Sequence, residues 1–193
     1  GFLESLWIGG TNKIVQWPEV EFKNLNHLRR IYLFGCPNLT GTIPSKIYDD
    51  EIVLLPRLQE LDIKSCESLV HVPNLPASLE KLTIHYCPKL VSMPTILGNV
   101  KELRELSVTN CGALMTFPDG MYGVTVLKKM QMERCPRVET LPEGMLHELP
   151  ALEELWIVEC PKLHGSFSRG GAYWNLVEQV PERTVRGYHA LNA

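Results

Sequence analysis

The chain has 193 residues, of which 45% are hydrophobic and 21% are charged, and its formal net charge is -3. This composition argues against a nucleic-acid partner, which would favour a basic excess, and no apolar run approaches the roughly 20 residues that cross a bilayer. The opening "GFLESLWIGG" shows no basic region and no signal-peptide core. Because it starts without Met inside a repeating pattern, we expect a piece of a longer protein.

Seven similar units follow one another, starting near residues 3, 28, 58, 79, 103, 127 and 152, at spacings of 25, 30, 21, 24, 24 and 25 residues. The first is partial: Leu3, Leu6 and Ile8 fit, but Thr11 stands where later units have cysteine. The template is L-x-x-L-x-I-x-x-C-x-x-L-x-x-apolar-P. Units of 20–29 residues with L-x-x-L-x-L-x-x-N/C are the signature of leucine-rich repeats.

The repeat predicts an α/β solenoid over residues 1–163, a leucine-rich-repeat horseshoe with a parallel concave sheet of about seven strands. The convex side is expected to be irregular or short-helical. Short helical turns are predicted at 118–126 and 142–150, an extended crossing at 72–79, and a bulge or longer helix at 45–55.

The two ends depart from the pattern. Residues 164–193 drop the repeat and are predicted to form a capping segment or tail, with Gly165, Gly170 and Gly171 marking a loop. Apolar residues of this tail are expected to cover the last unit: Trp174, Leu176, Val177 and Val180. The N-terminal end shows no polar cap, so we expect missing repeats before residue 1 and self-association through this uncapped end when the chain is expressed alone.

All six cysteines occupy the same repeat position: Cys36, Cys66, Cys87, Cys111, Cys135 and Cys160. We expect them to form a structural ladder of buried, free thiols. Disulfides between stacked units would distort the turn. Zinc would need closely spaced ligand pairs, and a catalytic thiol would need one exposed, activated site.

No motif for phosphate binding, metal-dependent hydrolysis or nucleophilic catalysis appears, so we predict no enzyme activity, no cofactor and no metal site. Function is instead expected on the concave face, because strand alternation turns side chains outward there. The residues predicted to bind a protein partner are Trp7, Tyr32, Phe34, Lys64, His85, Tyr86, Arg134 and Trp156. Thr109 is also expected to be exposed on this face.

Two alternatives stay open for the aromatic residues. Trp7, Tyr32 and Phe34 could instead pack on preceding repeats or another domain, and Trp156 could lie under the tail. Charged residues before and at the strand starts alternate in sign and indicate a solvated surface: Arg29, Arg30, Glu80, Glu105, Lys128, Lys129, Glu153 and Glu154.

The units "LEKLTIHYCPKLVSMP", "LRELSVTNCGALMTFP" and "LEELWIVECPKL" resemble the C-terminal leucine-rich repeats of plant intracellular nucleotide-binding immune receptors. The coiled-coil class from grasses is the most similar, and "YWNLVEQVPERTVRG" resembles the ends of those chains. The resemblance implies recognition of a pathogen or pest effector, directly or through a host protein. It also implies restraint of the parent's nucleotide-binding and coiled-coil domains, and a cytoplasmic location that can include the nucleus.

Two alternative functions are an extracellular receptor ectodomain and a substrate-selecting domain of a ubiquitin ligase. The stretch "NLTGTIPSKI" (38–47) resembles plant extracellular leucine-rich repeats, and Asn38 begins a glycosylation sequon, which would suit a receptor ectodomain. Leucine-rich repeats also select substrates for ubiquitin ligases. An upstream catalytic or F-box segment would indicate that role.

Overall fold

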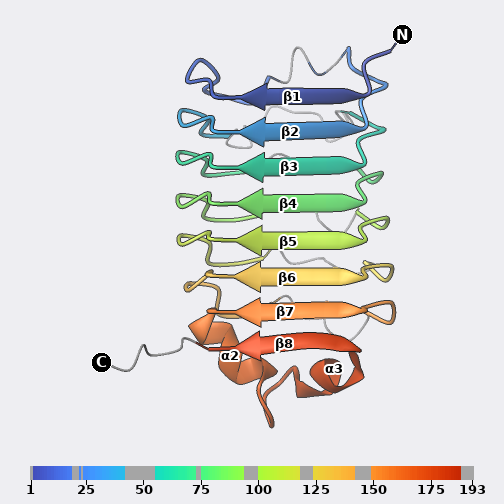
Figure 1. Cartoon of the computed structure of the whole chain (residues 1–193), viewed down its shortest axis with the longest axis vertical. Coiled ribbons are helices and arrows are strands. Elements are labelled where there is room, and N and C mark those ends of the chain that lie inside the picture. Colours follow the sequence, from blue (N-terminus) through green and yellow to red (C-terminus); the bar gives the residue numbers. More distant parts are fainter. Residues whose placement is uncertain are drawn as a thin grey trace, which may run out of the picture.

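The protein is a stack of parallel rungs. The computed structural model describes residues 2–18, 22, 24–41, 55–72, 75–93, 100–117, 124–141 and 149–187. Within these residues, eight five-residue strands form one parallel sheet whose spatial order is the chain order (Figure 1). The strands are β1 (Ser5–Gly9), β2 (Arg30–Phe34), β3 (Glu60–Lys64), β4 (Lys81–His85), β5 (Glu105–Thr109), β6 (Lys129–Glu133), β7 (Glu154–Val158) and β8 (Glu182–Arg186).

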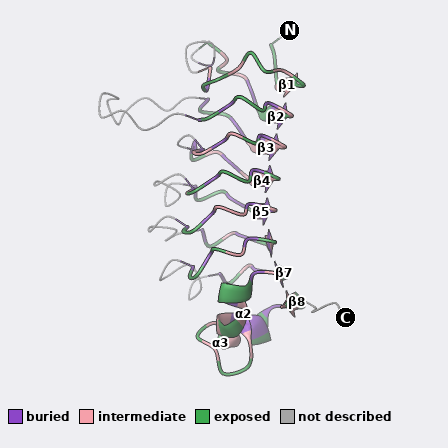
Figure 2. Cartoon of the chain, turned by 90° about the vertical axis from the view of Figure 1, so that its left-hand side faces the viewer, coloured by how far each residue is buried: buried purple, intermediate pink, exposed green. Residues whose placement is uncertain are grey.

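Seven of these strands lie where the leucine pattern predicts them, which confirms the leucine-rich-repeat solenoid. The units pair in register, so that Leu61 lies beside Leu82 and Leu82 beside Leu106. The second and fourth residues of each strand from β2 to β7 turn inward and are at most 2% exposed. Burying one such side chain contributes about 1.5–3 kcal/mol, so this inward row is a substantial part of the core of each rung, beside the equally buried leucines and cysteine before and after the strand. Figure 2 shows the strands as one column, with the rest of each turn on one side of it.

A left-handed residue directly follows each strand from β1 to β7. These residues have φ values of 52° to 60°: Gly10, Gly35, Ser65, Tyr86, Asn110, Arg134 and Glu159. A non-glycine residue in this conformation costs about 1–2 kcal/mol. The bend is held because each residue's N–H donates to the last carbonyl of the next strand, as from Tyr86 N to Thr109 O at 3.0 Å. The bend turns the chain inward, so the next residue, a cysteine in six units, enters the core.

Most of the predicted convex segments cannot be compared with the structure. The segments 118–123, 142–148 and 42–54, where helical turns and the longer helix are predicted, lie outside the described residues. Part of the predicted crossing at 72–79 also lies outside them.

The C-terminal tail forms two short helices and the eighth strand. Helix α2 spans Pro161–Phe167 and α3 spans Trp174–Gln179. The expected loop at Gly165 is therefore wrong, because Gly165 lies within α2. Proline suits the first helical position, and Leu163 and Phe167 face the core one turn apart. A Cβ on Gly171 would lie 2.3 Å from the Gly165 carbonyl oxygen, so only glycine fits this return past the helix.

The tail buries the end of the core. Leu176, Val177 and Val180 are buried there, and Trp174 packs against the core from a half-buried position. Strand β8 places Arg183 in register with Leu155 of β7, where the earlier strands carry apolar residues. The Arg183 guanidinium instead donates to the carbonyl oxygens of Glu178 and Val180, at 3.2 and 2.9 Å. The rung pattern therefore ends in a strand that the leucine spacing could not reveal.

Candidate protein-binding surface

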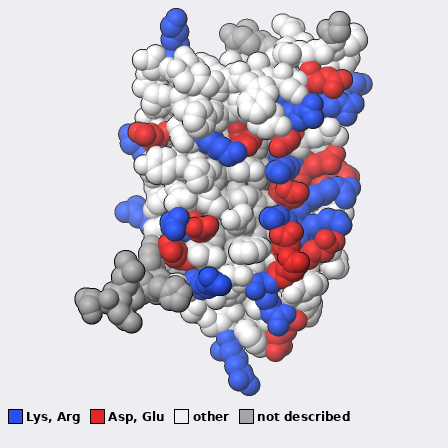
Figure 3. Space-filling view, viewed as in Figure 1, with Lys and Arg blue, Asp and Glu red and all other residues white. Residues whose placement is uncertain are grey.

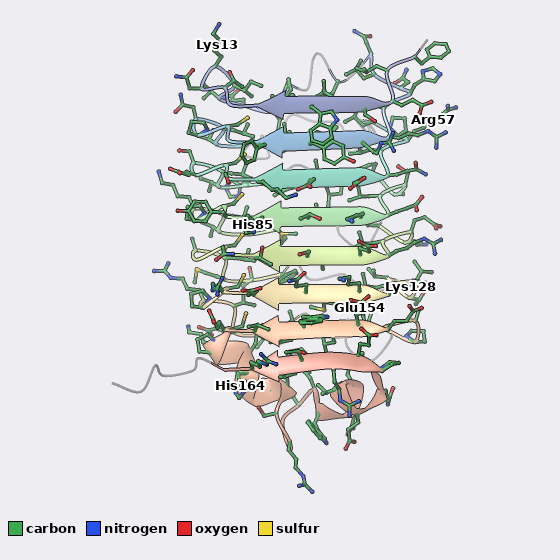
Figure 4. All side chains as sticks on the ribbon, viewed as in Figure 1. Lys13, Arg57, His85, Lys128, Glu154 and His164 are labelled. Carbon is green, nitrogen blue, oxygen red and sulfur yellow. The ribbon has the colours of Figure 1, made fainter. Side chains whose placement is uncertain are left out.

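The outer face of the sheet is the surface that the sequence analysis calls the concave face. It carries the first, third and fifth residue of every strand, because the pleat turns these side chains away from the core. The in-register pairing aligns them in columns across the strands (Figure 4). The central column is Trp7, Tyr32, Asp62, Thr83, Ser107, Gln131, Trp156 and Thr184.

Three aromatic side chains form a platform at the β1–β2 end of this face. We define the aromatic platform as Trp7, Tyr32 and Phe34. The rings of Trp7 and Tyr32 are stacked, with centroids 4.0 Å apart and planes 19° apart. Trp7 is 73% exposed and Phe34 is 60% exposed, and both lie on paired strands of the sheet. Large aromatic side chains in this state present apolar area whose burial can stabilise a complex.

Neighbouring residues shape the platform. The Tyr32 hydroxyl donates to the Glu60 carboxylate at 2.8 Å, which holds the ring in place. Burial, and next this hydrogen bond, raise the pKa of Tyr32 above its usual value. Gly9 lies beside Phe34 in the pairing of β1 with β2, and a Cβ at Gly9 would make only ordinary van der Waals contact with Phe34, at 3.4 Å from its carbonyl oxygen and 3.8 Å from Cδ1. Figure 3 shows mainly uncharged atoms over β1 and the C-terminal half of β2.

The middle of the face is polar and internally paired. Lys64 forms an ion pair with Asp62 at 2.7 Å. His85 Nδ1 lies 2.7 Å from the Thr109 hydroxyl. The predicted exposure of Thr109 is wrong: this residue is only 7% exposed, because the His85 ring on the neighbouring strand lies against its hydroxyl. Tyr86 is exposed at the left-handed bend just beyond β4.

The predicted residues do not meet in one cluster. Arg134 lies beyond β6, where its guanidinium pairs with Glu159 at 2.7 Å and with Glu133 at 3.1 Å. Trp156 lies on the outer face of β7, beside Gln131 and Thr184, and is 38% exposed. It is five strands from Phe34, or about 24 Å at the usual spacing. The structure therefore gives an aromatic platform at one end and a separate, more covered tryptophan at the other.

The N-terminal flank of the strands carries ion pairs between neighbouring rungs. Lys81 pairs with Glu105 at 2.9 Å and Lys129 pairs with Glu154 at 2.6 Å. One position earlier in the chain, the Lys128 ammonium lies 2.7 Å from Glu153. The charges alternate along this flank in Figure 3 and largely neutralise one another. Exposed pairs of this kind contribute about 0–1 kcal/mol, so this flank offers no strong field of one sign.

The six cysteines line the core behind the bends. All six are buried and free, and each thiol lies 3.4 to 3.9 Å from the carbonyl oxygen two residues earlier. Burial raises the pKa of Cys66 to about 11 and that of Cys87 to about 12. The hydrogen bond with the Cys111 thiol, together with burial, raises the pKa of Cys135 to about 12. Such thiols are protonated and inaccessible at neutral pH, so these sulfurs suit packing better than nucleophilic chemistry.

A second exposed apolar surface was missed by the sequence analysis. It lies four residues after the cysteine position and consists of the exposed Val15, Val91 and Met115 and the half-buried Val70, which we call the lateral stripe. Backbone bonds align the stripe, including Val91 N to Val70 O at 3.2 Å and Met115 N to Val91 O at 3.1 Å. Met115 is 49% exposed. Counting this position from each unit start would have found the stripe, because the same offset returns an apolar residue in four units.

The close packing beside this stripe also explains one glycine. Gly41 has a φ of 87°, and a Cβ there would lie 2.1 Å from the His71 carbonyl oxygen. The glycine at position 41 therefore has a local structural reason. Asn38, which begins the sequon, is exposed, and its side-chain amide donates to the Asn12 carbonyl oxygen at 2.8 Å.

The described ranges hold neither a cluster of metal ligands nor a helix suited to a membrane. No three His, Cys, Asp or Glu side chains in these ranges come together as metal ligands would. No helix among the described residues has the length and apolar character needed to cross a membrane.

Comparison with known proteins gives partial similarities. No family model matches the chain. The chain is 33% identical over 99 residues to the disease resistance protein RPP4 of Arabidopsis thaliana, which covers 50% of this chain. It is 32% identical over 111 residues to the disease resistance protein RPS4B of the same plant, which covers 51% of this chain. These matches span only 8% and 9% of the two relatives' lengths.

The fold has a solved counterpart. The Leptospira interrogans leucine-rich-repeat protein LIC12759 superposes with a TM-score of 0.57 over 84% of this chain and 40% of its own, at 23% identity. This likeness shows the leucine-rich-repeat fold.

Proposed function

We propose that the chain is a protein-binding and regulatory module of a plant innate immune receptor. Three observations support this: the leucine-rich-repeat fold, the partial similarity to two plant disease resistance proteins, and the resemblance of the repeats and tail to plant nucleotide-binding receptors. The proposed ligand is a pathogen or pest effector, or a host protein that the effector alters. The proposed module has no enzymatic role and acts inside the cell, in the cytoplasm or also in the nucleus.

The aromatic platform is the single observation that carries the binding role. Trp7 and Phe34 are large, mostly exposed and held on strands, so binding would order few additional degrees of freedom. Tryptophan and tyrosine are enriched among the residues that dominate binding energy at protein interfaces. Fully burying such a side chain contributes about 1.5–3 kcal/mol, so two or three of them can anchor a partner. An uncharged platform of this size suits an apolar or aromatic patch on the partner's surface.

The regulatory part of the proposal concerns the rest of the parent protein. In this proposal the module restrains a nucleotide-binding domain and a coiled-coil domain of the same polypeptide, in a receptor of the coiled-coil class from a grass. Binding of a ligand at the concave face would compete with that restraint, since a ligand shifts a two-state protein by its differential affinity for the two states.

The test uses a full-length receptor that carries this chain, expressed in leaf tissue with its triggering effector. Trp7→Ala and Phe34→Ala are expected to abolish or strongly change effector-dependent cell death at unchanged receptor abundance. The matched control is Val91→Ala with Met115→Ala, which removes exposed apolar side chains from the lateral stripe instead. Normal cell death in the platform variants would contradict the proposed role of the platform. A receptor gene that encodes no nucleotide-binding domain would contradict the proposed class.

A further inference from the structure

Asp62, in the middle of β3, has one carboxylate oxygen without a hydrogen-bond partner among the described residues. Its Oδ2 pairs with the Lys64 ammonium at 2.7 Å, whereas its Oδ1 is buried and unpaired there. The side chain is only 14% exposed, although it lies on the outer face of the sheet. Buried polar atoms are almost always hydrogen-bonded, and an unpaired one destabilises its surroundings. Asp62 therefore has an acceptor that suits a donor from outside the described residues.

This acceptor lies beside the aromatic platform and inside the sheet. Asp62 is in register with Tyr32 of β2, and Lys64 is in register with Phe34. Neighbouring strands lie about 4.8 Å apart, so the Asp62–Lys64 ion pair borders two of the three platform residues. Strand β3 has β2 on one side and β4 on the other (Figure 1). A protein seated on the platform would therefore also exclude water from Asp62.

The charges around Asp62 favour an uncharged donor. Lys64 already neutralises the carboxylate directly. Lys81 on β4 adds positive charge nearby: its pKa is raised chiefly by the hydrogen bond with Glu105, and further by the carboxylates of Glu60 and Asp62. These two lysines would repel a second cation at Asp62, whereas an amide or hydroxyl donor carries no net charge to be repelled.

We propose that Asp62 accepts a hydrogen bond from an uncharged donor, an amide N–H or a hydroxyl, of the protein that binds the aromatic platform. This inference rests on the proposed function, because it takes the platform as the binding surface. The terminal torsion of aspartate is broad, so the carboxylate can turn Oδ1 toward the partner, and the half-exposed Lys64 side chain can follow it.

The proposed contact makes Asp62 a residue that determines specificity. The partner surface has to combine an apolar patch for the platform with a polar donor about 5 Å away, one strand further along the sheet. A protein that offers only the apolar patch would leave the Asp62 oxygen unpaired inside the interface. Such a protein would be disfavoured, because a buried acceptor without a donor weakens binding.

The test uses a full-length receptor that carries this chain, in leaf tissue that receives increasing doses of the triggering effector. Asp62→Val removes both acceptor oxygens. It is expected to raise the effector dose for half-maximal cell death about tenfold or more, as for the loss of a hydrogen bond to a charged group. Asp62→Asn is the matched control, because it also breaks the ion pair with Lys64 but keeps one acceptor oxygen. Its dose is expected to rise by only about threefold.

The comparison of the two variants identifies the kind of donor. A rise for Asp62→Asn as large as that for Asp62→Val would show that the charge or the ion pair matters, and would overturn the uncharged donor. Thr83→Val removes an outward hydroxyl from the next strand and leaves Asp62 intact, so it is expected to keep the dose unchanged. Receptor abundance is measured for every variant, and Asp62→Ala replaces Asp62→Val if the valine variant accumulates poorly.

Phe34→Ala in the same assay separates this inference from the proposed function. Loss of the response with Phe34→Ala, together with an unchanged dose for Asp62→Val, would overturn the Asp62 contact and leave the platform as the binding surface. Unchanged responses in both variants would contradict the platform itself. Loss with Phe34→Ala, a large rise with Asp62→Val and a small rise with Asp62→Asn is the expected pattern.

Discussion

The two ends of the described sheet differ in how completely other residues cover the apolar core. At β8, α3 buries Leu176 and Val177 against the core, and Arg183 satisfies carbonyl oxygens at the end of that helix. At β1, the described residues place no such layer over Leu6 and Ile8, and the nearby aromatic side chains are exposed. A repeat stack gains stability mostly from contacts between neighbouring rungs, so a rung with one neighbour is weaker than a rung with two. Among the described rungs, the rung of β1 is therefore expected to be less stable than the rungs of β2 to β7.

Core truncation should show this difference most strongly. Leu106→Ala removes a side chain with 0% exposure in the middle of the sheet, and we expect a loss of about 2–5 kcal/mol in the free energy of unfolding. Leu6→Ala at the open end should cost about 1–2 kcal/mol, because the leucine is only half-buried. Chemical denaturation followed by circular dichroism measures both. Equal losses would show that the β1 core is as closed as the middle.

The thiol ladder predicts a loss of stability in alkaline solution. Cys87 has a pKa of about 12 in the folded chain, compared with a usual value of 9.0. Above pH 9 the unfolded chain releases thiol protons that the folded chain retains, so the unfolded state is favoured as the pH rises. The stabilising effect is complete below pH 9 and is lost as the pH rises from about 9 to about 12.

The rate of thiol labelling also tests whether the six cysteines are buried. At neutral pH a thiol reagent should label none of the six cysteines quickly, and all six after denaturation. Labelling in the native state, if it occurs through opening of the N-terminal rungs, should reach Cys36 before Cys87. Rapid native labelling of Cys87 or Cys135 would contradict a packed ladder.

Loss of the cap contact at the closed end should have a moderate effect. Arg183→Ala removes the donor to Glu178 O and Val180 O, and we expect a loss of about 1 kcal/mol. Hydrogen exchange should accelerate in residues 174–186 and remain unchanged in the middle rungs. Arg186→Ala in the same strand is the control, because the Arg183 contacts stay intact. Equal exchange rates in residues 174–186 of the two variants would show that the Arg183 contacts do not stabilise the C-terminal helices.

The ion pairs of the charged flank should matter least. Lys129→Ala breaks the pair with Glu154, and we expect a change below about 1 kcal/mol that shrinks further in high salt. The same denaturation assay measures it. A loss as large as that of Leu106→Ala would show that the flank, rather than the core, holds the rungs in register.

Much of this fold could be predicted from the sequence because one spacing repeats seven times. The offsets of Leu82, Ile84 and Cys87 recur in the other units, with Thr11 in place of cysteine in the first, and strand geometry converts the strand offsets directly into inward positions. Strand β8 could not be predicted this way, since Arg183 occupies an inward position and leaves only Val185 to mark the pattern. The outward direction of Trp7, Tyr32 and Phe34 follows from the same alternation.

Details of the face depended on neighbours that are distant in sequence. Thr109 is covered by His85, 24 residues earlier, and Arg134 pairs with Glu159, 25 residues later. Spacing identifies which strands are adjacent, but it does not reveal which rotamers meet. The separation of Trp156 from the aromatic platform, in contrast, follows from counting strands and could have been derived.

The central claim is that the aromatic platform is the surface that contacts the recognised protein. The most direct measurement places a photo-crosslinking phenylalanine analogue at position 34, and separately at position 115 of the lateral stripe, in a receptor that carries this chain. Illumination in the presence of the triggering effector is predicted to attach the effector, or the host protein that it alters, at position 34 and not at position 115. Attachment only at position 115, or none at position 34 while the receptor still responds, would contradict the claim.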